Sequence, residues 1–226
     1  MKMVLLAIET TGSICSVALF ANGKIAEKQS DTVNSHSKEL HLLIDELMKA
    51  EQVIYSELSA VVFSKGPGSY TGLRIGSSAA KGLCMALKTP LIAIASHESM
   101  LNAKELNLSQ FDIVFCATDA RRDEVYLTIF DNKKHILEPT AAIILEDTNP
   151  TTAYSGKKIL IIGSGAHKFE RFNNPNIKII NDDNLKAKNL IELAIVRFDN
   201  KNFEDIHQFE PFYLKQFYTT QKPLSF

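Results

Sequence analysis

Residues 66–76 have the sequence Gly-Pro-Gly-Ser-Tyr-Thr-Gly-Leu-Arg-Ile-Gly and join a short apolar run, residues 60–63, to a helical pattern. The apolar run predicts a buried strand. Pro67 fixes one φ angle, the glycines allow backbone conformations closed to other residues, and Thr71 can cap the helix that follows. Backbone N–H groups at such a helix start suit an anion. The loop is therefore either a ligand loop or a plain strand-to-helix turn.

Arg74 lies in the first turn of this predicted helix, where a cation opposes the helix dipole at a cost of about 0.3–1 kcal/mol. The position predicts a negatively charged partner. Glu9 and Asp119 are the first candidates, and a bound anion is the alternative. No Gly-Lys-Ser/Thr closes the loop, which excludes a P-loop.

The chain contains an internal repeat. Residues 4–9 (VLLAIE) align with residues 114–119 (VFCATD) at an offset of 110 positions. Each copy predicts a strand, a polar turn and an alternating strand, then a strand that runs into glycines, and a last strand before a helix. Two copies of this order predict two α/β units with mixed sheets.

Composition and charge limit the possible functions. The chain has 226 residues, a net charge of −1 and three cysteines, all in apolar runs. A protein that grips nucleic acid strongly normally has a basic face, so direct binding of a large nucleic acid is not expected to dominate. The cysteines predict reduced core thiols of a cytoplasmic protein. Neither a signal peptide nor a membrane-spanning segment is predicted.

Two helices are predicted in the first half, over residues 37–50 and 72–88. The first has an apolar face and the second a side of small residues that would let another backbone approach closely. Much of the circumference of the second helix is apolar, so either this chain or a partner must cover it. The candidate interface residues on the two helices are Leu40, Leu43, Ile44, Leu47, Gly72, Gly76, Ala79, Ala80 and Leu83.

No catalytic or metal-binding constellation is predicted. His36 and His41 are five residues apart, about 140° around a helix, so one metal ion cannot easily take both. Arg121 and Arg122 could meet phosphates, or they could pair internally with neighbouring acids, which is the commoner arrangement for a charged hairpin tip.

The segment 66–76 resembles the hallmark loop of the TsaB (YeaZ) family of bacterial tRNA threonylcarbamoyladenosine biosynthesis proteins. Residues 6–11, 119–126 and 211–215 are similar to three weaker motifs of that family. The resemblance implies a duplicated actin/sugar-kinase/Hsp70-like α/β fold, with domains over residues 1–104 and 105–226 and a C-terminal helix that returns to the first domain.

The resemblance also implies a function. The chain would be a non-catalytic subunit that supports the catalytic paralogue TsaD in transferring threonylcarbamoyl to a tRNA adenosine, alongside a TsaE-type ATPase. It would pair with TsaD, or with itself in isolation, through the two helices, and contact tRNA only indirectly. No intrinsic cofactor is expected; ATP or ADP would bind at a subunit interface. The candidate anion or nucleotide contacts are Glu9, Thr10, Thr11, Gly66, Pro67, Gly68, Thr71, Gly72 and Arg74.

Two other functions stay open at this point. The glycine loop and an interdomain cleft favour an autonomous ATP-dependent phosphotransferase, whose metal ligands are missing from the sequence. A metallopeptidase-like protein is suggested by an old label of the paralogous family, but the His-x-x-x-His pair that it needs does not occur. ATP turnover and metal analysis of the purified chain would discriminate between these alternatives.

Overall fold

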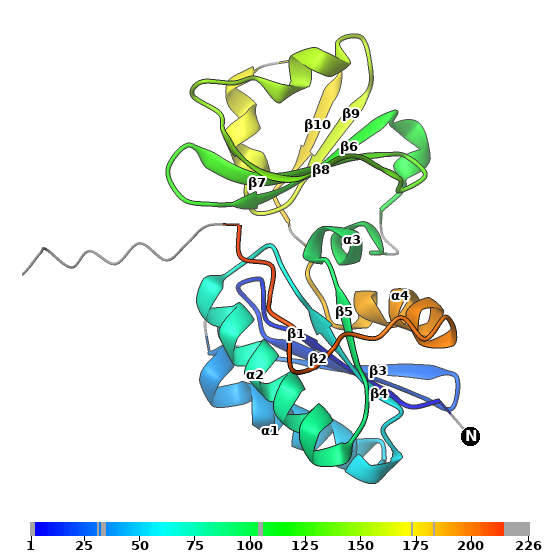
Figure 1. Ribbon diagram of the computed structural model, residues 1–226. Coiled ribbons are helices and arrows are strands. Elements are labelled where there is room, and N and C mark those ends of the chain that lie inside the picture. Colours follow the sequence, from blue (N-terminus) through cyan, green and yellow to red (C-terminus); the bar gives the residue numbers. More distant parts are fainter. Residues whose placement is uncertain are drawn as a thin grey trace, which may run out of the picture.

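The computed structural model of the protein describes residues 3–30, 32, 35–103, 106–172, 174–182 and 184–214. Two five-stranded sheets form two lobes, one above the other in Figure 1. The first sheet has the strand order β3-β2-β1-β4-β5 and the second has β8-β7-β6-β9-β10. The strands are β1 (Leu5–Glu9), β2 (Ser16–Ala21), β3 (Lys24–Gln29), β4 (Ala60–Ser64), β5 (Leu91–Ile94), β6 (Ile113–Asp119), β7 (Glu124–Asp131), β8 (Ile136–Ile144), β9 (Ile159–Ile162) and β10 (Ile177–Ile180).

The two sheets have the same topology. In the first, β1 pairs antiparallel with β2 and parallel with β4, while β2–β3 is antiparallel and β4–β5 is parallel. In the second, β6 takes the place of β1, with β7, β8, β9 and β10 following in the same relations. The predicted duplication and the duplicated α/β fold of the actin/sugar-kinase/Hsp70-like class are confirmed.

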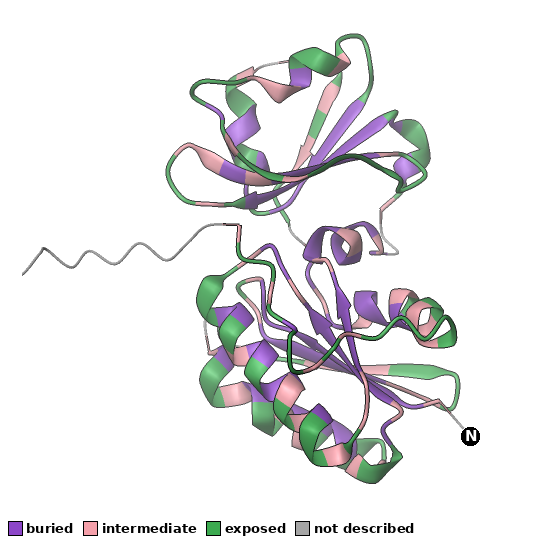
Figure 2. Ribbon diagram, viewed as in Figure 1, coloured by how far each residue is buried: buried purple, intermediate pink, exposed green. Residues whose placement is uncertain are grey.

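Helices cover both faces of the first sheet. Helices α1 (His36–Ala50) and α2 (Tyr70–Leu87) lie side by side on one face, and α4 (Lys188–Asp199) packs on the other (Figure 1). Every residue of β1 and β4 is buried for this reason, as the strands in Figure 2 show. Short helix α3 (Ser96–Leu101) follows β5 and contacts β6 of the second sheet.

The second lobe has shorter helical segments, namely the 3₁₀ turns η2 (Leu108–Gln110), η3 (Pro150–Tyr154) and η4 (Ala166–Phe172); η1 (Tyr55–Glu57) precedes β4 in the first lobe. Where α2 has 18 residues, the segment at the equivalent place, η4, has 7, because β10 follows β9 after a much shorter connection. Phe115 and Phe169 meet edge-to-face in the core between η4 and the sheet.

A strap of residues 200–214 crosses the first lobe after α4. Its Glu204 N–H donates to Leu91 O at 2.9 Å, and its Phe212 N–H donates to Lys65 O at 2.7 Å. Phe209 is buried, edge-to-face on Phe63. The strap thereby covers the outer edge of β5 and one end of β4. Lys215, the last residue of the fourth motif, lies outside the described residues.

Candidate functional site

The predicted loop residues and the β1–β2 turn lie together. A Cβ atom added to Gly72 would lie 1.9 Å from Thr10 O, and one added to Gly76 would lie 2.2 Å from Thr10 Oγ1. A Cβ atom on Gly68 would lie 2.6 Å from Thr11 O. Real Cβ atoms do not come this close, so the start of α2 can rest on the turn only because these three residues are glycines.

Hydrogen bonds fix this contact. Ser69 N–H donates to Thr11 O at 2.8 Å, and Thr10 Oγ1 donates to Gly72 O at 2.8 Å. Ser69 is also the N-cap, since its Oγ accepts from Gly72 N–H at 3.2 Å. The prediction that Thr71 caps the helix is wrong, because α2 begins at Tyr70 and Thr71 lies inside its first turn. The sequence predicted that backbone N–H groups of this loop would bind an anion. The N–H of Ser69 instead donates to Thr11 O in the β1–β2 turn.

A buried chain of hydroxyl groups ends on the Glu9 carboxylate. Glu9 is fully buried, and its Oε1 accepts from Thr11 N–H at 2.7 Å and from Thr11 Oγ1 at 2.6 Å. Ser96 Oγ donates to Thr11 Oγ1 at 3.1 Å, and Ser64 Oγ lies 3.0 Å from Ser96 Oγ. With Ser64 as the donor, the chain runs Ser64, Ser96, Thr11, Glu9. It ties the ends of β1 and β4 to the start of α3.

Arg74 does not have either of the acidic partners predicted for it. Its guanidinium carbon lies 5.6 Å from the centre of the Tyr70 ring, and Nη1 donates to Tyr70 Oη at 3.4 Å. Glu9 is buried beneath the turn and Asp119 binds Lys168, so neither reaches the exposed face of α2 on which Arg74 lies. The two first candidates, Glu9 and Asp119, are therefore not its partners, and the alternative, a bound anion, stays a prediction.

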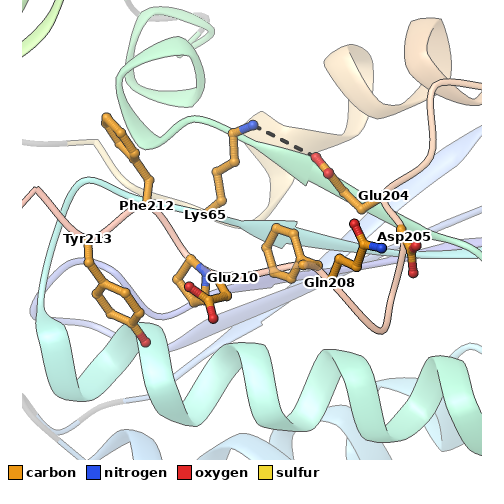
Figure 3. A pocket seen from close by; sticks show the side chains of 9 residues that line it. Lys65, Glu204, Asp205, Gln208, Glu210, Phe212 and Tyr213 are labelled. Carbon is orange, nitrogen blue, oxygen red and sulfur yellow. Dashed lines mark ion pairs between the residues drawn. The ribbon is translucent and has the colours of Figure 1, made fainter.

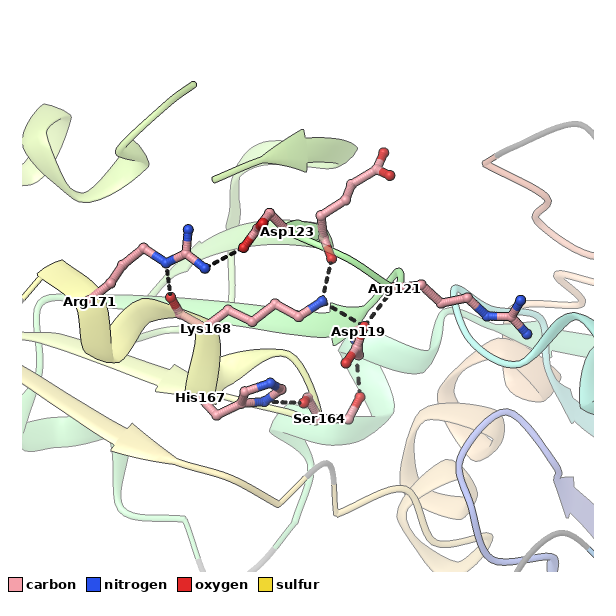
Figure 4. A network of polar contacts seen from close by, with 8 residues as sticks. Asp119, Arg121, Asp123, Ser164, His167, Lys168 and Arg171 are labelled. Carbon is pink, nitrogen blue, oxygen red and sulfur yellow. Dashed lines mark hydrogen bonds and ion pairs between the residues drawn. The ribbon is translucent and has the colours of Figure 1, made fainter. Parts of the chain in front are cut away.

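The second hairpin turn is held by ion pairs, which Figure 4 shows. Lys168 Nζ, nine-tenths buried, donates to Asp119 Oδ1 at 2.7 Å and to Glu124 O at 2.9 Å. Burial alone raises the pKa of Asp119, but hydrogen bonds from Lys168 and from Arg121 N–H outweigh it and leave that pKa below its ordinary value. Asp123 pairs with Arg171. Asp119 and Asp123, two of the acids next to Arg121 and Arg122, thus bind cations of η4.

His97 is a buried polar residue whose role the sequence did not indicate. Its Nδ1 lies 2.6 Å from Thr128 Oγ1 and its Nε2 lies 2.9 Å from Thr118 Oγ1. Burial lowers the pKa of His97 to about 3, so the ring is neutral at physiological pH. It links α3 to two strands of the second sheet. The sequence signal that could have indicated this role was the presence of Thr118 and Thr128 among apolar strand residues, since buried hydroxyl groups need hydrogen-bond partners.

The proposed interface residues need a correction. Leu40, Ile44, Leu47 and Ala80 are at most 2% exposed and belong to the core between the helices and the first sheet, while Leu43 and Leu83 are half-buried. These faces pack on the chain's own sheet, so most of their side chains cannot meet a partner. The outward side of α2 carries a different set of residues, namely Arg74, Ser78, Gly82, Met85 and Ala86.

An open pocket of about 500 Å³ lies on the strap (Figure 3). Strap side chains and Lys65 line it, and Lys65 Nζ lies 3.8 Å from Glu204 Oε1.

Among the residues that the structure describes, no group of three or more His, Cys, Asp or Glu side chains could hold a metal ion. In that same part of the chain, no helix has both the length and the hydropathy to cross a membrane.

Comparison with known proteins identifies the family. A family model described as TsaD, tRNA N6-adenosine threonylcarbamoyltransferase, matches residues 28–178. The tRNA threonylcarbamoyladenosine biosynthesis protein TsaB of Bacillus subtilis is 31% identical to this chain over 166 residues, 71% of each protein. The chain belongs to the TsaB (YeaZ) family. TsaB of Haemophilus influenzae is 28% identical over 230 residues, which cover 98% of this chain and 97% of that protein.

Structures of the TsaB family agree with this fold. YeaZ from Pseudomonas aeruginosa matches with a TM-score of 0.80 at 26% identity, covering 94% of this chain and all of that one. A threonylcarbamoyltransferase of Bacillus subtilis is 29% identical over 132 residues, 51% of this chain and 37% of that protein. The predicted family is confirmed, and its hallmark loop is, in this chain, the device that seats α2 on the β1–β2 turn.

Proposed function

We propose that this chain is a non-catalytic subunit in tRNA threonylcarbamoyladenosine biosynthesis and that it supports a TsaD-type transferase. The names of its TsaB relatives supply the pathway. We expect it to act in the cytoplasm, with a TsaE-type ATPase as a further partner and with ATP or ADP bound, if at all, at a subunit junction. In this scheme residues 1–104 carry the partner helices.

The main observation behind the proposed non-catalytic role is that the start of α2 packs directly on the β1–β2 turn. In an actin-fold phosphotransferase this turn faces the nucleotide. Here Thr10 and Thr11 lie against the start of α2 so closely that no Cβ atom fits at Gly72, and Glu9 accepts its hydrogen bonds from Thr11. A phosphate group would have to displace α2 to reach the turn. This geometry favours a scaffold over an autonomous phosphotransferase.

The outward side of α2 is the surface we propose for the partner. Gly82 lies inside the helix, where glycine costs about 1 kcal/mol relative to alanine, yet nothing lies within 4 Å of a Cβ added there. No contact with a residue that the structure describes therefore calls for a glycine at this position. Together with Ser78 and Ala86, Gly82 forms an exposed strip on which a second helix could lie closely, and Met85 beside it is 61% exposed.

The experiment is Gly82→Leu, which adds bulk in open space and should leave the monomer folded. We expect it to weaken capture by a TsaD-type protein and to weaken self-association at least ten-fold, because a stable interface buries at least about 1,000 Å² and tolerates little extra volume at its centre. Val196→Leu, on the exposed side of α4, is the matched control. Equal binding by both variants would refute the surface, and ATP turnover by the pure chain would refute the non-catalytic role.

A further inference from the structure

The tip of the β6–β7 hairpin presents two arginines, Arg121 and Arg122. Both are exposed, and both have left-handed backbone conformations, with φ of +70° and +50°. Asp119 Oδ1 accepts Arg121 N–H at 2.6 Å, and Glu124 N–H donates to Arg121 O at 3.2 Å, which closes the turn. Residues with a Cβ atom adopt this conformation only at an energetic cost.

Another hairpin tip of this chain has the same pair of left-handed conformations with different residues. At the tip of the β2–β3 hairpin, Asn22 and Gly23 have φ of +56° and +76°. Asn-Gly is the residue pair that tolerates consecutive left-handed conformations best. Long side chains adopt this conformation singly elsewhere, as Lys134 does at the β7–β8 tip with φ of +69°, but among the described residues only Arg121 and Arg122 are consecutive non-glycine residues that adopt it. This doubled backbone cost indicates that the arginine side chains are kept for their chemistry.

The guanidinium groups are not held by Asp119 or Asp123, because both of these carboxylates are bound by other cations. Lys168 holds Asp119 and Arg171 holds Asp123, both from the η4 side of the hairpin. Neither Arg121 nor Arg122 has an ion pair or a side-chain hydrogen bond to any residue that the structure describes. In Figure 4 the Arg121 side chain extends away from this network. The two ion pairs hold the carboxylates of Asp119 and Asp123 beside η4, while the two arginines are exposed at the tip.

We propose that Arg121 and Arg122 bind two backbone phosphates of an RNA. Guanidinium groups match phosphate oxygens with paired N–H donors. A projecting hairpin tip suits a large polyanion better than a free nucleotide, because small-molecule sites enclose most of their ligand. The choice of RNA rests on the proposed function. Since the net charge of the chain is −1, the tip is a local anchor within a larger complex rather than the main grip on the RNA.

The test compares Arg121→Gln/Arg122→Gln with Lys157→Gln/Lys158→Gln. The control removes the same charge from an exposed pair just before β9, at the opposite end of the same sheet. Binding of a tRNA transcript to the chain with its TsaD-type partner is titrated between 50 and 200 mM KCl (roughly the range over which phosphate contacts are lost). We expect the arginine variant to bind roughly ten-fold more weakly at low salt, and its slope of log K against log[KCl] to be shallower by about 1.5–2.

Four results would overturn the proposal: a wild-type slope in the arginine variant, an equal loss in the control, no RNA binding by wild type, or a loss of ADP binding with RNA binding intact. Arg121→Lys/Arg122→Lys should retain the slope and lose part of the affinity, because the charge stays and the paired donors do not. Capture of the TsaD-type protein by the same samples is scored separately. If the wild-type chain fails to capture the TsaD-type protein, the proposed function fails. Titration of the tRNA transcript with the chain alone then tests whether Arg121 and Arg122 bind RNA.

Discussion

Replacing Gly72 by alanine tests whether the hallmark loop is a packing device. In an ordinary exposed helix position this change would stabilise by about 1 kcal/mol. Here the new methyl group would lie 1.9 Å from Thr10 O and 3.0 Å from Thr10 C, so the start of α2 must move by more than an ångström. Overpacking of this kind costs roughly 1–3 kcal/mol, and losing the hydrogen bond from Thr10 Oγ1 adds about 0.5–1.5 kcal/mol.

We therefore expect Gly72→Ala to lower the free energy of unfolding by about 1.5–4.5 kcal/mol. For a chain of this size that corresponds to a fall in Tm of roughly 3–18 °C. Chemical denaturation followed by circular dichroism gives the free energy, and a thermal scan gives Tm. Gly82→Ala, ten residues further along the same helix, is the matched control. It meets open space and should raise the free energy of unfolding by about 1 kcal/mol.

The sign of the difference between the two alanine variants decides the matter. If Gly72→Ala were as stable as wild type or matched Gly82→Ala, the close approach of α2 to the β1–β2 turn would not exist. The loop glycines would then need another explanation, and the filled turn would no longer support a scaffold role.

Three further predictions test other parts of the structure. Because the pKa of His97 is about 3 in the folded chain and near 6.5 when unfolded, its stabilising effect is full above pH 6.5 and is lost as pH falls. Between pH 7.5 and 5.5 it should contribute a loss of about 1.4 kcal/mol to the free energy of unfolding, absent from His97→Gln. Asp119→Ala leaves the Lys168 ammonium buried without its carboxylate, so it should lower the free energy of unfolding, measured by denaturation, by roughly 2–4 kcal/mol. Asp123→Ala breaks a more exposed ion pair and should lower it by at most about 1 kcal/mol. Equal losses in the two variants would contradict the burial argument. Phe209→Ala should cost about 3–5 kcal/mol and expose the β5 edge to hydrogen exchange; unchanged exchange there would mean that the strap does not protect it.

The sequence predicted the repeat and the elements that local patterns control. Strands such as β4 and β9 are short apolar runs, and the repeated order of elements predicted two mixed α/β sheets, whereas the strand order within each sheet came from the structure. The loop residues and the Glu9-Thr10-Thr11 turn were also grouped correctly, because parallel strands β1 and β4 end at the same edge of the sheet.

Side-chain partners could not be predicted in the same way. Arg74 was assigned an acid by helix electrostatics, but its described contact is with Tyr70, one turn earlier. Asp119 is bound instead by Lys168, which lies 49 residues later in the chain. The face of α2 was misjudged because Ala80 and Gly82 are both small. One is buried against the sheet and the other is in open space, and composition alone does not distinguish them.

The two equivalent hairpin turns of the duplicated fold, β1–β2 and β6–β7, differ sharply in this chain. The first has lost its access, since α2 and a chain of hydroxyl groups fill it and leave Glu9 fully buried. The second has kept its access and carries exposed arginines whose acidic neighbours are bound elsewhere. This difference between the two turns fits the two proposals made above, a protein partner on the first lobe and an RNA contact on the second.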